Sequence, residues 1–349
     1  MNFIRKALCV AMTAATASCM FAREWHEDIL GPGFEYTTVD QGTDYAGPVC
    51  SSVIRLKTDC NDGKHRAILY VHGYNDYFFQ EELARTMADS CWNFYAVDLR
   101  KYGRSILPEN KKFQVRDIRE YFADIDSAIA IIKEDGVDEV ALMGHSTGGL
   151  TTTLYMAEHP DTIVKTLILN SPFYEWNQSS LNRNLLIPAM DGIGKLFPGL
   201  EIPQGDNTSY AESLLKNHHG EWEYNTDWKL FKSQPVEASW IRAIDKAQAD
   251  LRNRIAPVEV PMLLAHSDHS LHPKQWTEAC DSADVVLDVE HISRIGRTLG
   301  TNVTEAIVPG GMHDLALSAP GIRHAYYDTV LAWLRRTMPN YQAYRHLYK

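Results

Sequence analysis

One serine stands where a nucleophile could be made. In MGHSTGG, Ser146 lies between Gly144 and Gly148, directly after the apolar run VALM and directly before a helical segment. A sharp turn from strand to helix strains the serine backbone and crowds its neighbours, so the flanking positions need glycine and the hydroxyl projects above the sheet. The first amides of the helix would face the same point and suit a developing anion. The pattern G-x-S-x-G in this context predicts a nucleophilic serine.

A serine nucleophile needs a base to take its proton, and the base needs an acid to hold its tautomer. Where a strand turns into a helix at the serine, the three residues follow the order serine, acid, histidine along the chain. Of the 14 histidines, His313 in VPGGMHDLALS is placed best, because it follows the last predicted strand and a loop can return it to Ser146. We expect His145, beside the serine, to be structural and Asp314 to cap or brace its loop.

The anion formed by attack on a carbonyl needs two backbone amide donors. One is expected from Thr147, the residue after the nucleophile, and the other from the loop after the strand that ends in VHGYN, where Tyr74 is the candidate. Gly73 permits the close turn of that loop, and we expect His72 to fix it through hydrogen bonds rather than to react. These two amides are the predicted oxyanion hole.

Buried strands must carry these residues to one edge of a sheet. AILYVHG, over 67–73, is a short apolar run rich in β-forming residues, and the segment after it has helical spacing. The same unit recurs at NFYAVDLR, DEVALMGHS and VKTLILNS, and later come VPMLLAHS, NVTEAIVPGG and a helical stretch over 323–336. This alternation predicts an α/β fold with a mostly parallel sheet and helices on both faces.

The segment 172–257 interrupts the alternation. It has no buried-strand pattern, but it is rich in Trp, Tyr, Phe and Pro. About 85 residues are too many for a loop, so we expect a partly helical subdomain that forms a lid over the carboxyl ends of the strands, where α/β folds bind ligands. Residues 23–171 and 258–349 would then form the core of the fold. Most of the aromatic residues are expected to pack the subdomain itself.

Composition narrows the class of partner. The chain of 349 residues is 45% hydrophobic and 23% charged, which suits one large folded domain with an insertion. Its formal charge of −11 is spread over the whole length, which argues against binding nucleic acid and does little to favour anionic membrane surfaces. A small molecule is the expected partner.

Residues 1–22 have the pattern of a signal segment. Two basic residues, Arg5 and Lys6, precede a small and apolar stretch that is too short to span a membrane comfortably. Cleavage after Ala17 would give an exported protein, periplasmic or secreted. A loose lipoprotein box ending at Cys19 offers membrane association through lipidation. The alternative is an N-terminal extension of a cytoplasmic enzyme.

Four cysteines follow that segment: Cys50, Cys60, Cys91 and Cys280. A bridge from Cys50 to Cys60 is conceivable in an oxidising compartment, but buried thiols are the expectation for a chain large enough to fold without disulfides. There is no C-x-x-C motif to support a zinc site built on cysteine pairs.

Four motifs carry a family resemblance. GHSTGG, VHGYN, AVDLRKYGRS and PGGMHDLALS, with the aromatic insertion after the sixth strand, resemble the α/β-hydrolase superfamily, most closely its serine aminopeptidase S33 group of monoacylglycerol lipase and lysophospholipase type. The resemblance spans residues 25–334. It implies the α/β-hydrolase fold, a Ser, Asp, His triad, a lid, no cofactor, and hydrolysis of carboxylic esters, often of single-chain lipids. Lys101 and Tyr102 depart from the family's D-x-R-G-H-G-x-S, in a stretch that shapes a loop.

The resemblance leaves more than one aspartate as the acid. Asp268 in LLAHSDHS has the familiar place shortly after the seventh strand, whereas SADVVLDVEHISRIGRTLG gives Asp284 the surroundings typical of the family's acid. From Asp284 to His313 is 29 residues, enough for one helix of about four turns, a loop and the last strand; from Asp268 it is 45. We predict Asp284, with 266–281 as an insertion that delays it. Asp268 is the alternative and Asp288 a more distant one.

One cluster has the residue types of metal ligands: His266, Asp268, His269 and His272. No glutamate or cysteine partner lies in register with them, so we interpret them as surface polar residues and predict no metal site.

These patterns predict an exported serine hydrolase that acts on carboxylic esters with an apolar acyl or aryl group. Its substrate would be a small ester or a lipid, and peptidase or amidase activity on a small N-terminal residue is the second enzymatic option. A non-catalytic binding protein on the same scaffold is the alternative from another class. The predicted site consists of Ser146, His313, Asp284, Tyr74 and Thr147.

Overall fold

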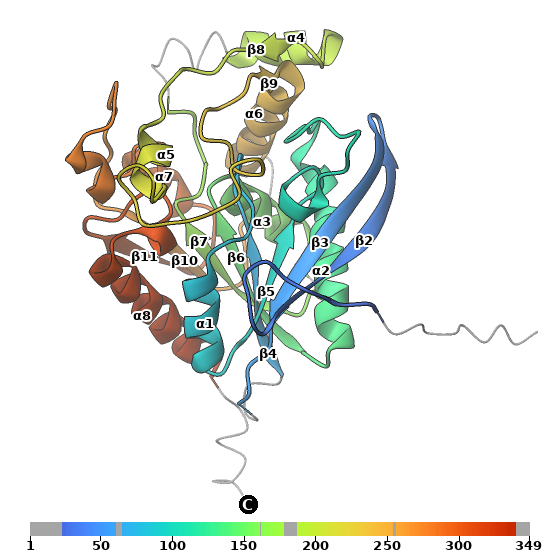
Figure 1. Cartoon of the computed structure of the whole chain (residues 1–349), viewed down its shortest axis with the longest axis vertical. Coiled ribbons are helices and arrows are strands. Elements are labelled where there is room, and N and C mark those ends of the chain that lie inside the picture. Colours follow the sequence, from blue (N-terminus) through green and yellow to red (C-terminus); the bar gives the residue numbers. More distant parts are fainter. Residues whose placement is uncertain (1–22, 61–64, 161, 178–186, 254–255, 340–349) are drawn as a thin grey trace, which may run out of the picture.

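The fold is built on one large sheet, seen in a computed structural model that describes residues 23–60, 65–160, 162–177, 187–253 and 256–339 (Figure 1). A nine-stranded sheet has the order β1-β2-β3-β5-β4-β6-β7-β10-β11, and β8 and β9 form a separate pair. The strands are β1 His26–Glu27, β2 Phe34–Asp44, β3 Gly47–Leu56, β4 Arg66–Val71, β5 Asn93–Asp98, β6 Glu139–His145, β7 Val164–Asn170, β8 Glu201–Ile202, β9 Val236–Glu237, β10 Met262–Ser267 and β11 Val303–Val308. The α-helices are α1 Glu81–Asp89, α2 Phe122–Glu134, α3 Thr147–Glu158, α4 Ile187–Leu196, α5 Ser209–Leu214, α6 Ala238–Asn253, α7 Val289–Gly296 and α8 Pro320–Thr337. Short 3-10 helices include η5 Glu278–Ser282 and η6 Leu315–Leu317.

The centre of the sheet is parallel. The strand pairs from β5 through β4, β6, β7 and β10 to β11 are all parallel, while β3 joins β5 antiparallel and carries β2 and β1 at that edge. The central strands are apolar runs because helices cover both of their faces. The predicted mostly parallel α/β fold is confirmed.

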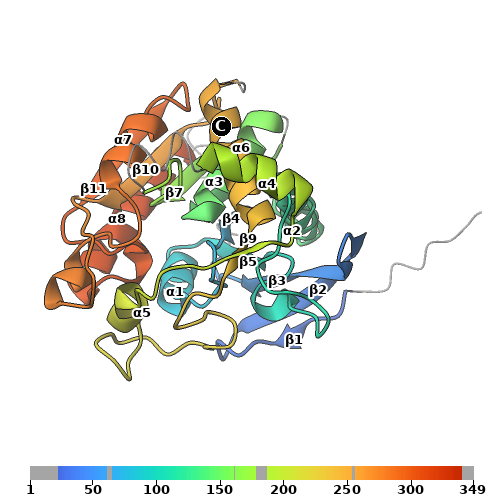
Figure 2. The ribbon, with the colours of Figure 1, turned by 90° about the horizontal axis from the view of Figure 1, so that it is seen from above.

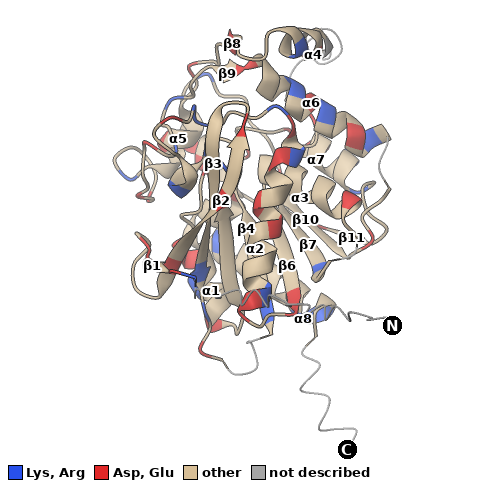
Figure 3. Ribbon diagram, turned by 90° about the vertical axis from the view of Figure 1, so that its right-hand side faces the viewer, with Lys and Arg blue, Asp and Glu red and all other residues tan. Residues whose placement is uncertain are grey.

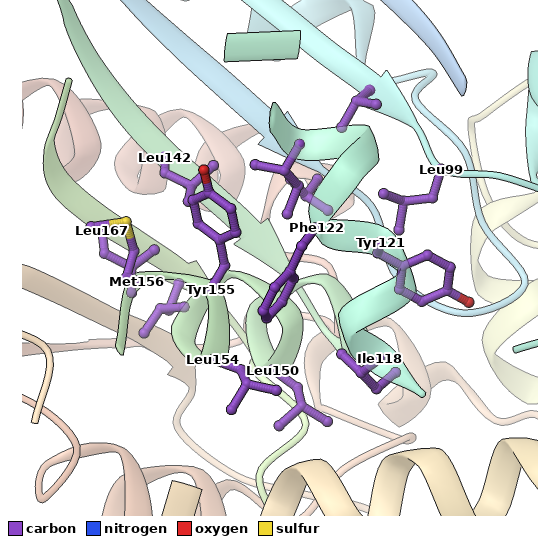
Figure 4. Packing of buried hydrophobic residues seen from close by; sticks show 14 of the residues in the cluster. Leu99, Ile118, Tyr121, Phe122, Leu142, Leu150, Leu154, Tyr155, Met156 and Leu167 are labelled. Carbon is purple, nitrogen blue, oxygen red and sulfur yellow. The ribbon is translucent and has the colours of Figure 1, made fainter. Parts of the chain in front are cut away.

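Alternate residues of each central strand enter two separate cores. In β4, Leu69 and Val71 pack with helices α2, α3, α6 and α7, while Ile68 and Tyr70 pack with α1 and α8 on the other face. Figure 4 shows part of the first core, where side chains of α2 and α3 meet those of the sheet. The sheet is therefore fixed from both sides, and so are the loops at its carboxyl edge.

The segment 172–257 lies at the end of the sheet toward which the parallel strands run. It is partly helical, containing α4, α5 and α6 with the short pair β8 and β9 (Figures 1 and 2). Helix α6 packs against α3, and Trp240 and Ile241 of α6 belong to the first core. This segment is thus joined to the first core through α6.

The cysteines differ from the sequence expectation in one pair. Cys60 and Cys91 form a disulfide, with Cα atoms 5.2 Å apart, whereas Cys50 and Cys280 are free and buried. The suggested bridge from Cys50 to Cys60 is wrong, because Cys50 lies within β3 with its Sγ against the carbonyl of Ser105. Cys91 follows α1, which brings it beside the segment after β3.

Figure 3 shows Lys and Arg mixed with Asp and Glu across one side of the molecule. Within the described ranges, no helix has both the length and the apolar character needed to cross a bilayer. The predicted signal segment, residues 1–22, and its Cys19 lie outside the described residues.

Candidate functional site

Ser146 occupies the sharp turn between β6 and α3. Its backbone has φ 55° and ψ −119°, a left-handed conformation that a residue other than glycine adopts only under constraint. A side chain at Gly144 would collide with Thr152, and one at Gly148 with the carbonyl oxygens of Val71 and His72. The two glycines therefore allow helix α3 to start directly behind the serine.

His313 lies between Ser146 and Asp284. Its Nε2 is 3.0 Å from Ser146 Oγ, and its Nδ1 is 2.9 Å from Asp284 Oδ2. The exposed fractions are 9% for Ser146, 3% for His313 and 0% for Asp284, so water is largely excluded from this chain of hydrogen bonds. A carboxylate at Nδ1 favours the tautomer in which Nε2 is free to accept a proton from the serine hydroxyl.

Asp284 reaches this position through a long excursion of the chain. After β10 the chain leaves the sheet at residue 268 and returns to pair Asp284 with Ser270, where the Asp284 amide donates to His269 and its carbonyl accepts from Leu271. Asp284 therefore lies in space just beyond the end of β10, although it is far from β10 in the sequence. Its Oδ1 accepts from the amides of Val286 and Leu287, each at 2.8 Å.

The other three aspartates take different places. Asp268 is exposed; although its slight burial acts in the opposite direction, the amide of Gly310 and the ring of His269 hold the pKa of its carboxyl below the ordinary value. Asp288 caps α7 by accepting from the amide of Glu290. Asp314 braces its own loop, as expected, by accepting from the Ala316 amide. The bond to His313 Nδ1 is made by Asp284.

The loop after β4 approaches Ser146 closely. A Cβ at Gly73 would lie 2.9 Å from the Cβ of Ser146, so the adjoining Tyr74 is held next to the serine. His72 fixes this loop, as expected: the Leu99 amide donates to its Nε2, which leaves Nδ1 to donate to the Gly73 carbonyl at 2.8 Å. Burial lowers the pKa of His72, in keeping with a neutral ring.

Two further features surround the serine. Thr147 is the first residue of α3, a position whose amide has no acceptor within an α-helix. His145 is buried, its Nδ1 lies 3.1 Å from the carbonyl of Asn170, and its ring centroid is 4.9 Å from that of His313. Burial lowers the pKa of His145, in keeping with a neutral ring beside His313.

A cavity of about 420 Å³ opens beside His313. Its wall includes Tyr74 and His145 together with side chains of the segment 172–257 and Val286 from the loop after Asp284. Side chains of the segment 172–257 and of the loop after Asp284 thus meet at the cavity that His313 lines.

An ion pair that the sequence reasoning missed lines this cavity. Lys229 Nζ donates to Asp76 Oδ1 at 2.9 Å, and the side chains are only 8% and 3% exposed. Among the described residues, Asp76 Oδ2 and the hydroxyl of Tyr224, which also lines the cavity, have no hydrogen-bond partner. Asp76 lies three residues after Gly73, so its place in the predicted oxyanion loop could have indicated that it lies near the site. Lys229 lies in an aromatic stretch whose sequence contains no pattern that indicates a role at the site.

Residues with metal-ligand chemistry lie in two places. In the predicted surface cluster, His266 is buried, but both of its nitrogens are engaged, with the Ser267 carbonyl and with Glu305. Elsewhere in the described ranges, ligand atoms of Asp76, His145 and Asp314 lie within 4.8 Å of one another. The ammonium of Lys229 already neutralises Asp76 there.

The carboxylate of Asp314 is likewise occupied. It accepts from the side-chain amides of Gln80 and Asn170, at 2.9 and 2.7 Å. Although burial acts in the opposite direction, these hydrogen bonds and the one from the Ala316 amide hold the pKa of Asp314 below its ordinary value. The group therefore serves as a hydrogen-bonded brace between loops.

Comparisons with known proteins identify the family of the chain. The family model described as "Serine aminopeptidase, S33" matches residues 63–318. The monoglyceride lipase of Mus musculus is 23% identical over 276 residues, which cover 78% of this chain and 83% of that protein.

Solved structures share the fold. A soluble variant of monoglyceride lipase from Saccharomyces cerevisiae, in complex with a substrate analog, has a TM-score of 0.63 at 15% identity and covers 86% of this chain and 94% of its own. A thermostable carboxyl esterase from Bacillus coagulans has a TM-score of 0.61 at 15% identity, covering 86% and 98%. At these identities the likeness concerns the fold.

Proposed function

Because the chain belongs to the serine aminopeptidase S33 family, we propose that it is a serine hydrolase that cleaves carboxylic esters through an acyl-enzyme. The observation that carries the proposal is the position of His313, whose ring bonds Ser146 Oγ on one side and Asp284 Oδ2 on the other. A buried carboxylate, imidazole and hydroxyl in this order can make a serine nucleophilic at neutral pH.

The reaction follows from these contacts. Ser146 Oγ attacks the ester carbonyl carbon while His313 Nε2 takes its proton, and Asp284 stabilises the resulting imidazolium. The carbonyl oxygen, now negative, is held by the amides of Tyr74 and Thr147. His313 then gives the proton to the departing alcohol, and water activated by the same ring releases the acid from Ser146.

For the substrate we propose esters of an apolar acyl group with a polar alcohol, of the monoacylglycerol or lysophospholipid kind. The cavity beside His313, where the alcohol leaves, contains the Lys229–Asp76 pair and the unpartnered oxygens of Asp76 and Tyr224. Hydroxyl groups of an alcohol can satisfy such oxygens, which are costly to bury without partners. The names of the mouse and yeast relatives point to the same class of ester.

The aminopeptidase alternative draws on one observation. The free oxygen of Asp76 could accept from the ammonium of a substrate with a free amino terminus. The ammonium of Lys229 on the other oxygen of the same carboxylate opposes a second cation. Ester hydrolysis is therefore the function that this cavity favours.

Labelling and turnover test the proposal. A fluorophosphonate probe should label the wild-type chain, and p-nitrophenyl esters of increasing chain length should be hydrolysed; Ser146→Ala should abolish labelling and lower kcat by about 10⁴-fold or more. Ser127→Ala, a change on α2 where Ser127 bonds Ala123 and Gln41, is the matched control and should keep wild-type activity.

The same assays separate the alternatives. Labelling that survives in Ser146→Ala would exclude this serine as the nucleophile. Faster turnover of aminoacyl amides than of monoacylglycerols and lysophospholipids would favour the peptidase, and absence of any turnover by wild type would leave a binding protein.

A further inference from the structure

The loop that carries Tyr74 depends on a contact from outside the sheet. It follows β4, and Asn75 within it has a left-handed backbone with φ 48°. This conformation is uncommon for a residue with a side chain and persists where surrounding contacts impose it. The amide of Tyr74 is therefore positioned by whatever holds Asn75.

Part of the segment 172–257 holds it. We call residues 225–230 the clamp segment. The side chain of Asn75 donates to the Leu230 carbonyl at 2.9 Å and accepts from the Leu230 amide at 2.8 Å, so one side chain pairs with both polar groups of a backbone residue. The Asn225 amide donates to the Tyr77 hydroxyl at 2.8 Å.

A buried ion pair reinforces these bonds. Lys229 of the clamp segment donates to Asp76, the residue after Asn75. The ammonium also lies within 6 Å of the ring centroids of Phe79, Tyr210 and Tyr224, which fix its position through cation–π contacts. A buried charge is costly without such partners. Separating the clamp segment from the loop would therefore leave the charges of Lys229 and Asp76 either exposed to water or buried without a partner.

We infer that the clamp segment is a positioning element of the oxyanion hole, and that Asn75 and Lys229 are its positioning residues. The inference rests on the proposed function, since it concerns the Tyr74 amide as an oxyanion donor. On this view the region above the sheet has two roles: it covers the cavity, and it sets the geometry that stabilises the negative oxygen. An amide displaced from that oxygen loses transition-state binding while substrate binding remains.

The test compares Asn75→Gly with wild type. Glycine adopts the left-handed backbone freely but lacks both bonds to Leu230, so the loop can fold while losing its clamp. We expect kcat on a p-nitrophenyl ester to fall about 10- to 100-fold. KM should stay within about threefold, and the affinity for a trifluoromethyl ketone transition-state analogue should fall by the same factor as kcat/KM.

Two substitutions of Lys229 distinguish a loss of positioning from misfolding. Lys229→Met should lower kcat in the same way, and Lys229→Arg, which keeps a cation for Asp76, should restore part of it. Lys232→Met is the matched control, because Lys232 lies in the same insertion but forms an exposed pair with Asp206, and it should retain wild-type kcat.

The outcomes are distinct. If wild type is active and labelled but Asn75→Gly keeps its kcat, or changes KM alone, the clamp inference is overturned and the proposed function stands. If wild type neither hydrolyses esters nor reacts with fluorophosphonate, the proposed function fails and the inference fails with it.

Discussion

At Asp284 the two carboxylate oxygens have separate partners. Oδ2 accepts from His313, and Oδ1 accepts from the amides of Val286 and Leu287. The amides hold the carboxylate plane, so the acid arrives at the histidine already oriented. Asp268 stands nearer the end of β10 in the sequence, but its partners are the Gly310 amide and the ring of His269.

We expect substitutions of Asp284 and Asp268 to have different effects on catalysis. Asp284→Asn should lower kcat about 10³- to 10⁴-fold, because an amide at this place no longer favours the tautomer that accepts the serine proton. Asp268→Asn should keep kcat within about threefold. Steady-state kinetics of both variants on one ester settle the comparison, and the reverse order would assign the acid to Asp268.

Among the elements, the ends of α1, β7 and η6 are joined by one buried carboxylate. Asp314 accepts from Gln80 at the start of α1, from Asn170 at the end of β7 and from the Ala316 amide of η6. These are the same loops that surround the serine and histidine. Asp314 thus stabilises the edge of the sheet on which the site is built.

Its contribution should depend on pH. The pKa of Asp314 is lowered below its ordinary value of 3.8, so as the pH falls the unfolded chain takes up the proton first and stability declines. The contribution is complete above about pH 5 and is lost as the pH falls through the lowered pKa. Asp314→Asn would turn an amide donor toward Gln80 or Asn170 and should cost about 2 kcal/mol at pH 7.

Thermal melting checks this. The gap in melting temperature between wild type and Asp314→Asn should be largest near pH 7 and should narrow on acidification toward pH 3. A gap that stays constant over this range would show that the charge of Asp314 contributes nothing to stability.

For the whole molecule, the sequence predicted those features that depend on residues close together in the chain. The strand and helix alternation predicted the sheet, and the glycines around Ser146 predicted its turn, because both depend on neighbours in sequence. Lys229 and Asp76 were missed, since their meeting depends on how the segment 172–257 folds back over the sheet. The pairing of Cys60 with Cys91 was missed for the same reason: it joins the end of α1 to the segment after β3.

That disulfide bears on where the protein acts. Disulfides persist in oxidising compartments, which supports our proposal that the chain is exported through residues 1–22. Protein isolated from its native source should have an intact mass that lacks the signal segment and two hydrogens, with added lipid mass if Cys19 is acylated. A full-length mass with free thiols at Cys60 and Cys91 would place the enzyme in the cytoplasm instead.

The chain between Ser270 and Asp284 forms a loop whose two ends lie side by side. Two backbone bonds, between Asp284 and residues 269 and 271, close the excursion at its base. The entropy cost of closing a loop rises only slowly with the number of residues in it. Residues between the two ends can therefore be gained or lost while the base stays closed. The closed base thus fixes the position of the Asp284 carboxylate separately from the length of the stretch that precedes it.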